Sequence, residues 1–409
     1  MQRDTLETTL YDAMAAMDII DSHEHLGPER ERVASPVDVF TLFSHYTSAD
    51  LRVAGMSLED YQSLADQAIP LQTRWATFKP YYENIRWGSY ARAALLAAKK
   101  FYDVDDINDD TYELLTERIR QANTPSIYQR VLGDACNIRA AITQCCSTDL
   151  DSPLLTPVMP IFFDTVSWEA LMREQCVAGE EVNSLDDYVD AIGRYIVRSK
   201  AEGAVGLKMF AHPHSPPCRD AATSAFNALR NDPEMRLTEP NPINDYLVDR
   251  AVSIGTEEGL VIAVHAGYWG DFRQLDPLHM IPMLQRYPDT KFDIYHLGYP
   301  WVRETLMLGK SFPNVWLNFC WTHIISQRFA VAGLDEAIDL VPMNKILIFG
   351  GDYSLAVEKV YGHLVMARED MAEVFARRIR AGQMSESQAM ELAQKWFWDN
   401  PRDLYNLDL

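Results

Sequence analysis

The sequence predicts an α/β protein, a (β/α)8 TIM-like barrel with a mainly helical insertion after strand 1 and helices at the C-terminal end. Short apolar or β-branched runs recur along the chain, most are separated by stretches with helical periodicity, and each ends near a polar or charged residue. Because the runs are continuously apolar, we expect both faces of the sheet to be covered, as in a parallel barrel.

Eight runs supply the expected strands. They are residues 17–23, 138–143, 157–164, 204–210, 259–265, 291–296, 315–319 and 345–352. Eight parallel strands in sequence favour a closed barrel over an open sheet. A chain of 409 residues with 47% hydrophobic content is sufficient for one large core with an insertion. We therefore expect residues 1–409 to form a single domain.

Residues 27–137 separate the first run from the second, which is far too long for one crossover. Two stretches within them, SLEDYQSLADQAI and SYARAALLAAKKFYD, have helical spacing, with Ser57 and Ser89 as candidate N-caps. We expect a helical insertion over the barrel mouth, acting either as a lid or as a solvated embellishment. Residues 354–382 and 385–407 predict two or three terminal helices.

Composition disfavours several classes of protein. There are 37 Lys and Arg against 59 Asp and Glu, a formal charge of -22, without a basic run that would hold nucleic acid. None of the six cysteines forms a CxxC pair, which favours reduced, mostly buried thiols in the cytoplasm. No window approaches the roughly 18 apolar residues of a membrane span, and the N-terminus does not look like an export signal.

The strongest local signal is Asp21-Ser-His23-Glu-His25 at the end of the first run. Alternate residues of a strand point to the same side, so His23 and His25 can present two imidazoles to one metal. Other residues that commonly bind metals stand at the ends of later runs: His265 ends the fifth, His296 the sixth and Asp352 the eighth. Barrel enzymes assemble their sites at these strand ends, so the sequence predicts a metal site there.

The motifs D-x-H-x-H, HAG, HLG and GGDY, in this order, resemble those of the amidohydrolase superfamily. The ending FWDNPRDLYNL resembles the closing helix of the branch that includes decarboxylases and lactonases. The resemblance implies one or two divalent ions (Zn, Mn or Fe), the first bound by His23, His25 and Asp352. It also implies that His265 ligates this ion or a second one, that Asp352 is the proton-shuttling base, and that His296 is a second-metal ligand or a catalytic acid/base.

Lys208, in AVGLKMF of the fourth run, stands where binuclear relatives carry a carbamylated lysine that bridges two metals. A carbamate there would supply two oxygens and a negative charge. Alternatively, Lys208 is a free ammonium that pairs with a substrate carboxylate, or a lysine that reaches the solvated rim. The number of metal ions is therefore left open.

Other residues are candidates for contacting substrate. His323 follows the seventh run and would touch substrate or complete a metal shell, while Arg74 and Arg86 of the insertion could grip a carboxylate. Loop aromatics suit a small organic ligand: Tyr268, Trp269, Tyr299, Trp301 and Trp321. Asp21 and Glu24 are expected to support the ligands, and His212 and His214 are expected in a loop that supports the site or contacts substrate. The remaining histidines are expected to be structural or exposed: His45, His279 and His363.

The leading functional hypothesis is hydrolysis of an amide, lactone or ester in a small, carboxylate-bearing molecule. The resemblance leaves open a mononuclear decarboxylase, a dinuclear iron-containing (Fe/Fe or Fe/Mn) oxygenase and, more weakly, a sugar-acid isomerase of the kind that carries helical insertions. A non-enzymatic subunit should lack a ligand, and here every expected ligand is present. We expect a homo-oligomer or a hetero-oligomer with a related subunit.

Overall fold

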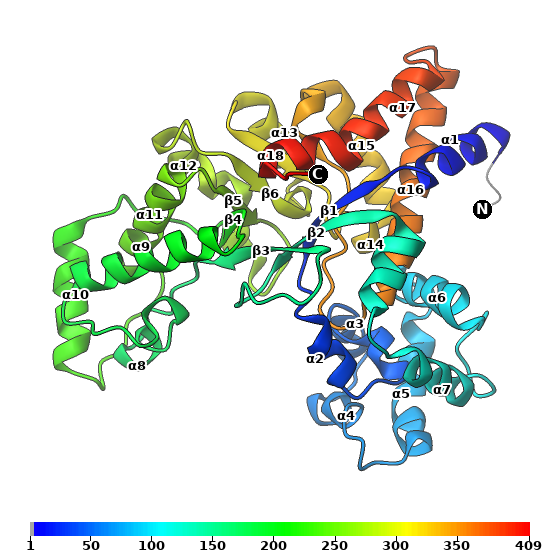
Figure 1. Ribbon diagram of the computed structural model, residues 1–409, viewed down its shortest axis with the longest axis horizontal. Coiled ribbons are helices and arrows are strands. Elements are labelled where there is room, and N and C mark those ends of the chain that lie inside the picture. The colour runs from blue at the N-terminus through cyan, green and yellow to red at the C-terminus, as the bar shows by residue number, and fades with distance from the viewer. Residues whose placement is uncertain (1–3) are drawn as a thin grey trace.

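The computed structural model describes residues 4–409 and contains eight parallel strands that neighbour one another in chain order (Figure 1). They are β1 (Ile19–Glu24), β2 (Ile138–Gln144), β3 (Leu155–Pro160), β4 (Gly206–Phe210), β5 (Val261–His265), β6 (Phe292–Ile294), β7 (Val315–Asn318) and β8 (Ile346–Leu347). Every residue of β1 is buried, as expected for a strand covered on both faces. The predicted (β/α)8 barrel is confirmed.

The ring closes between β1 and the segment that follows β8. The amide of Ser22 donates to the Phe349 carbonyl over 3.0 Å, and the amide of Asp352 donates to the His23 carbonyl over 2.9 Å. The His25 amide then donates to the Tyr353 carbonyl over 3.0 Å. These bonds place the ends of the first and last strands side by side.

Three strands are shorter at their C-terminal ends than predicted. The runs 157–164, 291–296 and 345–352 are paired only as far as Pro160, Ile294 and Leu347. Two of these segments turn into left-handed backbone, with a φ of 64° at both His296 and Asp352. A left-handed residue cannot continue a strand ladder, so both side chains stand on turns just beyond the sheet.

Helices and short turns fill the connections and cover the barrel. After β2 they are α8 (Trp168–Leu171), η3 (Gln175–Val177), α9 (Leu185–Ala201), α10 (Arg219–Asn231), α11 (Pro242–Glu257), η4 (Phe272–Leu275), η5 (Pro277–Met280), α12 (Ile281–Arg286), η6 (Tyr295–Gly298), α13 (Val302–Ser311), α14 (Thr322–Ile325), α15 (Gln327–Leu340) and η7 (Met343–Lys345). Three terminal α-helices, α16 (Glu358–Arg380), α17 (Glu386–Gln394) and α18 (Asn400–Tyr405), with η8 (Lys395–Asp399), confirm the predicted C-terminal helices. An N-terminal helix, α1 (Thr5–Ala15), packs on α16.

Residues 27–137 are mainly helical, as predicted. They contain α2 (Glu29–Ala34), η1 (Val39–Phe43), α3 (Thr47–Val53), α4 (Leu58–Ser63), α5 (Leu71–Ile85), α6 (Ser89–Tyr102), α7 (Tyr112–Ala122) and η2 (Gln129–Ala135). Ser57 caps α4 by accepting from the Asp60 amide, but the N-cap of α6 is Gly88. The predicted cap at Ser89 is wrong because Ser89 is already the first helical residue.

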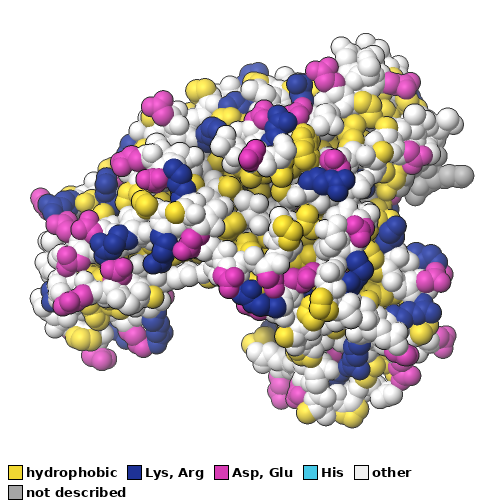
Figure 2. All heavy atoms as spheres, in the orientation of Figure 1, with side chains coloured by type: hydrophobic (Ala, Val, Ile, Leu, Met, Phe, Trp, Pro, Cys, Tyr) yellow, Lys and Arg dark blue, Asp and Glu magenta, His cyan; other side chains and the backbone are white. Residues whose placement is uncertain are grey.

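The insertion is attached to the start of α16 by buried polar contacts. Arg32 pairs with Glu358 at 2.9 Å, and the Tyr102 hydroxyl donates to the same carboxylate over 2.6 Å. The Lys359 Nζ donates to the Thr47 hydroxyl over 2.9 Å. In Figure 1 the insertion forms a lobe at the lower right, and Figure 2 shows a deep recess between it and the lobe of α8, α9 and α10.

The inside of the barrel is packed with apolar side chains. Ile20, Val158, Val261 and Leu347 belong to this interior cluster, and Tyr405 of α18 joins it from the far end. A filled interior leaves the C-terminal rim of the strands as the place for a site.

Six free cysteines are present, of which Cys136, Cys176 and Cys320 are buried and Cys145, Cys146 and Cys218 are not. The expectation of mostly buried thiols therefore holds for only half of them. Among residues 4–409, no helix is both long and apolar enough to cross a bilayer.

Candidate metal centre at the barrel mouth

Three potential ligand atoms converge where β1 and the segment after β8 meet. The Nε2 atoms of His23 and His25 lie 3.3 Å and 3.2 Å from the same oxygen of Asp352, Oδ1. His23 and Asp352 are fully enclosed, whereas the side chain of His25 is 28% exposed and faces the mouth. Two imidazoles and a carboxylate aimed at one point are typical of a divalent cation site.

The backbone beneath these ligands is held by two buried carboxyl groups. Asp21 Oδ1 accepts from the amides of His23 and Gly351, both over 3.2 Å, and Glu24 Oε2 accepts from the Tyr353 amide over 2.7 Å. Burial raises the pKa of Asp21 to about 7 and that of Glu24 well above its usual range. Asp21 and Glu24 therefore support the ligands through the main chain and do not contact their imidazole rings.

His296 and His265 complete the cluster from the next strands around the ring. His296 Nδ1 lies 3.8 Å from Asp352 Oδ2 and 3.1 Å from the Cys320 carbonyl, and its Nε2 lies 2.9 Å from His265 Nδ1. Ligand atoms of His23, His296 and Asp352 all lie within 4.8 Å of one another. The five residues predicted from the strand ends thus form one continuous group.

The electrostatics of the cluster suit a bound cation. Burial lowers the pKa of His23 to about 3 and of His296 to about 4, so these rings are neutral at pH 7. Burial alone would raise the pKa of Asp352, but His23 and His25 hold it well below its usual range. Both Asp352 oxygens and His265 Nε2 are buried without a hydrogen bond among the described residues. Unpaired buried carboxylate oxygens are costly, and a divalent ion would satisfy them.

Lys208 is enclosed inside the barrel, with 1% of its surface exposed. The predicted alternative that Lys208 reaches the solvated rim is therefore wrong, because its position on β4 directs the side chain into the barrel interior. Its Nζ lies 5.1 Å from the ring centre of Tyr295 and 5.3 Å from that of Phe210. Burial lowers the pKa of Lys208 to about 8.

His323 does not join the cluster. Its Nδ1 lies 2.9 Å from Asp370 Oδ2 of α16, and its Nε2 lies 3.0 Å from the Ile348 carbonyl. Both ring nitrogens are therefore occupied in joining α14 to α16 and the last strand, and neither faces a substrate.

The two arginines proposed as carboxylate ligands are paired within the insertion. Arg74 is buried against Asp38 at 2.6 Å and also donates to the Leu64 carbonyl. Arg86 Nη2 donates to both carboxylate oxygens of Asp106 over 2.8 and 2.9 Å. Neither guanidinium is directed to the metal centre.

A cavity of about 600 Å3 adjoins the centre beneath the insertion. Trp269 and Tyr268 line it from the barrel loops, together with Tyr46 and His45 from the insertion. Tyr46 stacks on Trp321 with ring centres 4.2 Å apart, and His45 lies 5.9 Å from His25. The insertion thus covers the mouth, and His45, which the sequence predicted to be structural or exposed, lies at the site.

Four further histidines lie outside the ligand group. His363 is buried, with Nδ1 3.3 Å from the Gly351 carbonyl, and His279 Nδ1 lies 3.3 Å from the Ala211 carbonyl. His212 and His214 line a separate cavity next to β3 and β4.

A family model described as Amidohydrolase matches residues 183–407, which is more than half of the 409 residues. The matched segment includes His265, His296 and Asp352. A curated relative, protein fluG of Emericella nidulans, is 26% identical over 179 residues, which is 42% of this chain and only 21% of the fungal protein.

Solved structures of similar shape cover nearly the whole chain. A uronate isomerase from Thermotoga maritima has a TM-score of 0.81 at 16% identity, covering 98% of both chains. A glucuronate isomerase from Caulobacter crescentus has a TM-score of 0.80 at 17% identity, covering 99% of this chain and 94% of that one. A putative metal-dependent hydrolase from Lactobacillus casei has a TM-score of 0.68 at 18% identity, covering 97% of both chains. At these identities the likeness establishes the fold.

Proposed function

Because the chain belongs to the amidohydrolase family, we propose that this metal-dependent enzyme hydrolyses an amide, lactone or ester bond in a small, carboxylate-bearing organic molecule. The observation that carries the proposal is the convergence of His23 Nε2 and His25 Nε2 on Asp352 Oδ1, in a cluster where neither carboxylate oxygen has a hydrogen bond among the described residues. A divalent ion held there would lower the pKa of a water molecule and polarise a substrate carbonyl.

The proton-transfer role falls to Asp352. Its carboxylate is ionised at neutral pH and has one oxygen, Oδ2, on the side of His296. It can take a proton from the attacking water and return it to the leaving group as the bond breaks. The 3.1 Å contact of His296 Nδ1 with the Cys320 carbonyl fixes the orientation of that ring beside the carboxylate.

We assign recognition of a substrate carboxylate to Lys208, which is buried in the barrel with its Nζ facing the rings of Tyr295 and Phe210. A buried ammonium strongly favours an anionic partner, because charge–charge attraction is poorly screened away from water. The aromatic cavity beneath the insertion would enclose the apolar part of the same molecule and exclude bulk water during reaction.

Isomerisation of a sugar acid is the second candidate. It is favoured by the likeness to uronate and glucuronate isomerases, which extends over 98% and 99% of this chain and so includes the insertion as well as the barrel. In that reaction Asp352 and His296 would move a proton between neighbouring carbons and oxygens of an open-chain sugar acid.

The two candidates are separated by an assay of the purified protein against two panels, one of N-acyl amino acids and lactones, the other of hexuronates. Hydrolysis is followed by the appearance of the free amino acid or the opened hydroxy acid, and isomerisation by the appearance of a ketose. Turnover of the first panel alone supports hydrolysis, and turnover of the second alone overturns it. Asp352→Asn should abolish whichever activity is found, while His279→Asn, outside the cluster, should retain it.

A further inference from the structure

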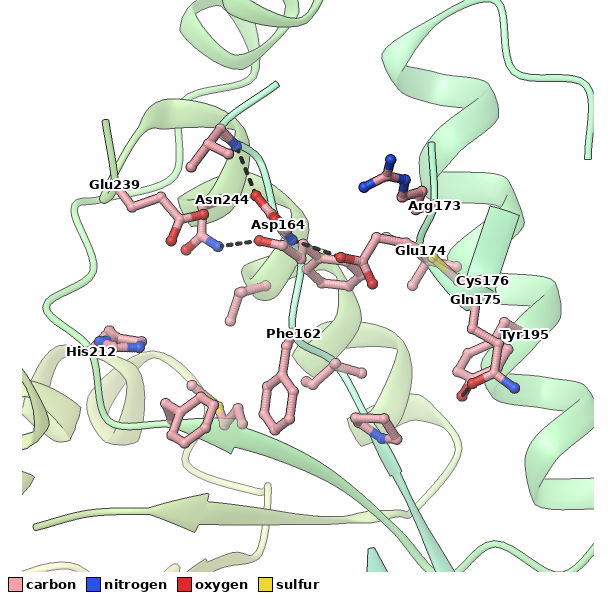
Figure 3. Close-up of a pocket in the computed structure, with 18 of the residues that line it drawn as sticks. Phe162, Asp164, Arg173, Glu174, Gln175, Cys176, Tyr195, His212, Glu239 and Asn244 are labelled. Atoms are coloured by element: carbon pink, nitrogen blue, oxygen red, sulfur yellow. Dashed lines mark hydrogen bonds between the residues drawn. The ribbon is translucent and has the colours of Figure 1, made fainter. Parts of the chain in front are cut away.

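A second cavity, of about 750 Å3, opens beside the barrel mouth between the ends of β3 and β4 and the lobe formed by α8 and α9. Figure 3 shows Asp164, Glu174 and Glu239 around its polar side and Phe162 on its floor. None of the five metal-centre residues lines it. This acidic cavity is therefore a separate compartment of the mouth.

The carboxylates of the acidic cavity are only partly satisfied. Glu174 Oε1 accepts from the Asp164 amide over 2.8 Å, and Glu239 Oε1 accepts from the Thr165 amide over 3.2 Å. The second oxygen of each glutamate has no hydrogen-bond donor among the described residues. Partial burial, with repulsion from Asp164 and Glu239, raises the pKa of Glu174. A cation bound between these carboxylates would offset the repulsion that Glu174 receives from Asp164 and Glu239.

The positive groups near the acidic cavity do not neutralise it. Arg173 lines the rim but is ion-paired with Glu169, its neighbour on the outside of α8. Burial lowers the pKa of His212, so its ring is neutral at pH 7. His214 is 11% exposed, and its two ring nitrogens are buried without a hydrogen bond in the described part of the chain, the nearer lying 3.6 Å from Asp245.

An aromatic pair connects the acidic cavity to the metal centre. The rings of Phe162 and Phe210 stack with centres 4.5 Å apart and planes at 28°. Phe210 also lies 5.4 Å from the ring of His265. A molecule that extends over this pair would have one end in the acidic cavity and the other near the metal ligands. Aromatic faces beside carboxylates are the surroundings that organic ammonium groups prefer.

We propose that the acidic cavity binds the protonated amino group of the substrate, so that the enzyme acts on an amine-bearing molecule whose reacting carbonyl reaches past Phe162 and Phe210 to the metal centre. This inference rests on the proposed function for the location of the reacting group. The formal charge of -22 on the whole chain would also draw a cationic ligand towards the protein.

The binding test needs no turnover. Calorimetric titration of the purified protein with 1,4-diaminobutane, and with uncharged 1,4-butanediol of the same length, measures the preference for charge directly. We expect the diamine to bind and the diol not to bind. The double change Glu174→Gln and Glu239→Gln keeps the side-chain shape and should weaken diamine binding about tenfold or more, because it removes charge-assisted contacts.

Two controls make the outcome decisive. Asp186→Asn removes a carboxylate of α9 that pairs with Arg219, and should bind the diamine as the parent does. Glu239→Gln alone should weaken diamine binding less than the double change does. Because Glu239 is exposed, this single variant should fold normally even if the double variant misfolds. Equal binding by the diol, or unchanged diamine binding in the double variant, would overturn the inference.

The result is independent of the proposed reaction. Asp352→Asn should bind the diamine normally, because Asp352 does not line the acidic cavity. Diamine binding without any hydrolytic activity in the parent would reject the proposed hydrolysis and retain the cation site. If the parent hydrolyses amine-bearing and neutral substrates at equal rates and does not bind the diamine, the proposed hydrolysis is retained and the cation site is rejected.

Discussion

The amide of Asp352 donates a 2.9 Å hydrogen bond to the carbonyl of His23, and this contact is one of three main-chain bonds that join the last segment of the barrel ring to the first strand. Because the contact fixes the backbone, the carboxylate of Asp352 lies 3.3 Å from the imidazole of His23. Barrel closure and assembly of the metal centre are therefore the same structural event.

Replacing Asp352 by Asn should remove the proton-accepting group while changing the volume very little. We expect the rate of the catalysed reaction to fall by about 100-fold to 10,000-fold, the range for losing a general base. Initial-rate kinetics check this, with circular dichroism to show that the fold persists. The exposed change Asp289→Asn is the control. Activity in Asp352→Asn within twofold of the parent would contradict the assigned role.

Lys208 should be an unmodified amine. Its Nζ lies 5.1 Å and 5.3 Å from the ring centres of Tyr295 and Phe210, whose faces attract a cation and repel a negatively charged carbamate, and this offsets part of the burial that lowers the pKa of Lys208 to about 8. Lys208→Met should therefore leave the metal content unchanged and raise KM for a carboxylate-bearing substrate by about tenfold to 100-fold, the cost of a hydrogen bond to a charged group.

Carbon-13 NMR of protein equilibrated with labelled bicarbonate tests the same point directly. A carbamate resonance that disappears in Lys208→Met, or partial rescue of Lys208→Ala by short carboxylic acids, would show instead that the lysine is carbamylated.

Gly351 has no room for a side chain. A Cβ atom there would lie 2.0 Å from Glu24 Oε1, whose partner oxygen holds the Tyr353 amide. Gly351→Ala should destabilise the protein by about 1–3 kcal/mol through overpacking and displace Asp352. Gly193→Ala in α9, where the new atom would be 3.7 Å from Ile254, should be neutral or stabilising by up to about 1 kcal/mol. Urea unfolding measures both, and equal stabilities would refute the steric argument.

The attachment of the insertion through Lys359 should make stability depend on pH. Burial lowers the pKa of Lys359 from 10.5 to about 7 in the folded protein. Between these values the unfolded chain binds more protons than the folded chain, so the contribution of Lys359 to stability increases as pH rises from about 7 to 10.5.

Lys359→Met should remove that contribution. The difference in unfolding free energy between parent and variant should shift in favour of the parent over this pH range, as measured by urea unfolding at several pH values. Lys200→Met, at an exposed ion pair with Glu258, is the control for loss of a positive charge. A difference that stays constant with pH would show that Lys359 titrates equally in both states.

The candidate ligands could be brought together from the sequence because strand ends of a parallel barrel meet at one rim. His23 and His265 are placed there by the periodicity of their runs, whereas Asp352 stands on a left-handed turn beyond the end of β8. His323 also follows a strand, but the short helix α14 turns its ring to Asp370. Strand position alone does not specify such a turn.

Residues of the insertion could not be placed in this way. His45 reaches the site because α6 packs on α14 and α16 and because Lys359 of α16 donates to Thr47 of α3, tertiary contacts that helical periodicity does not encode. The sequence predicts Arg74 and Arg86 as candidate ligands for a carboxylate, but they form ion pairs with Asp38 and Asp106 of the same insertion. Local patterns identify charged residues but not their partners when those are distant along the chain.

The metal centre itself is tested most directly by elemental analysis of the protein purified without added metal or chelator, in parallel with His23→Ala. We expect about one divalent ion per chain in the parent, the minimum that the convergent ligands His23, His25 and Asp352 require. His23→Ala should retain less than about a tenth of that amount. A metal-free parent, or a variant with the full parental metal content, would contradict the assignment of this cluster.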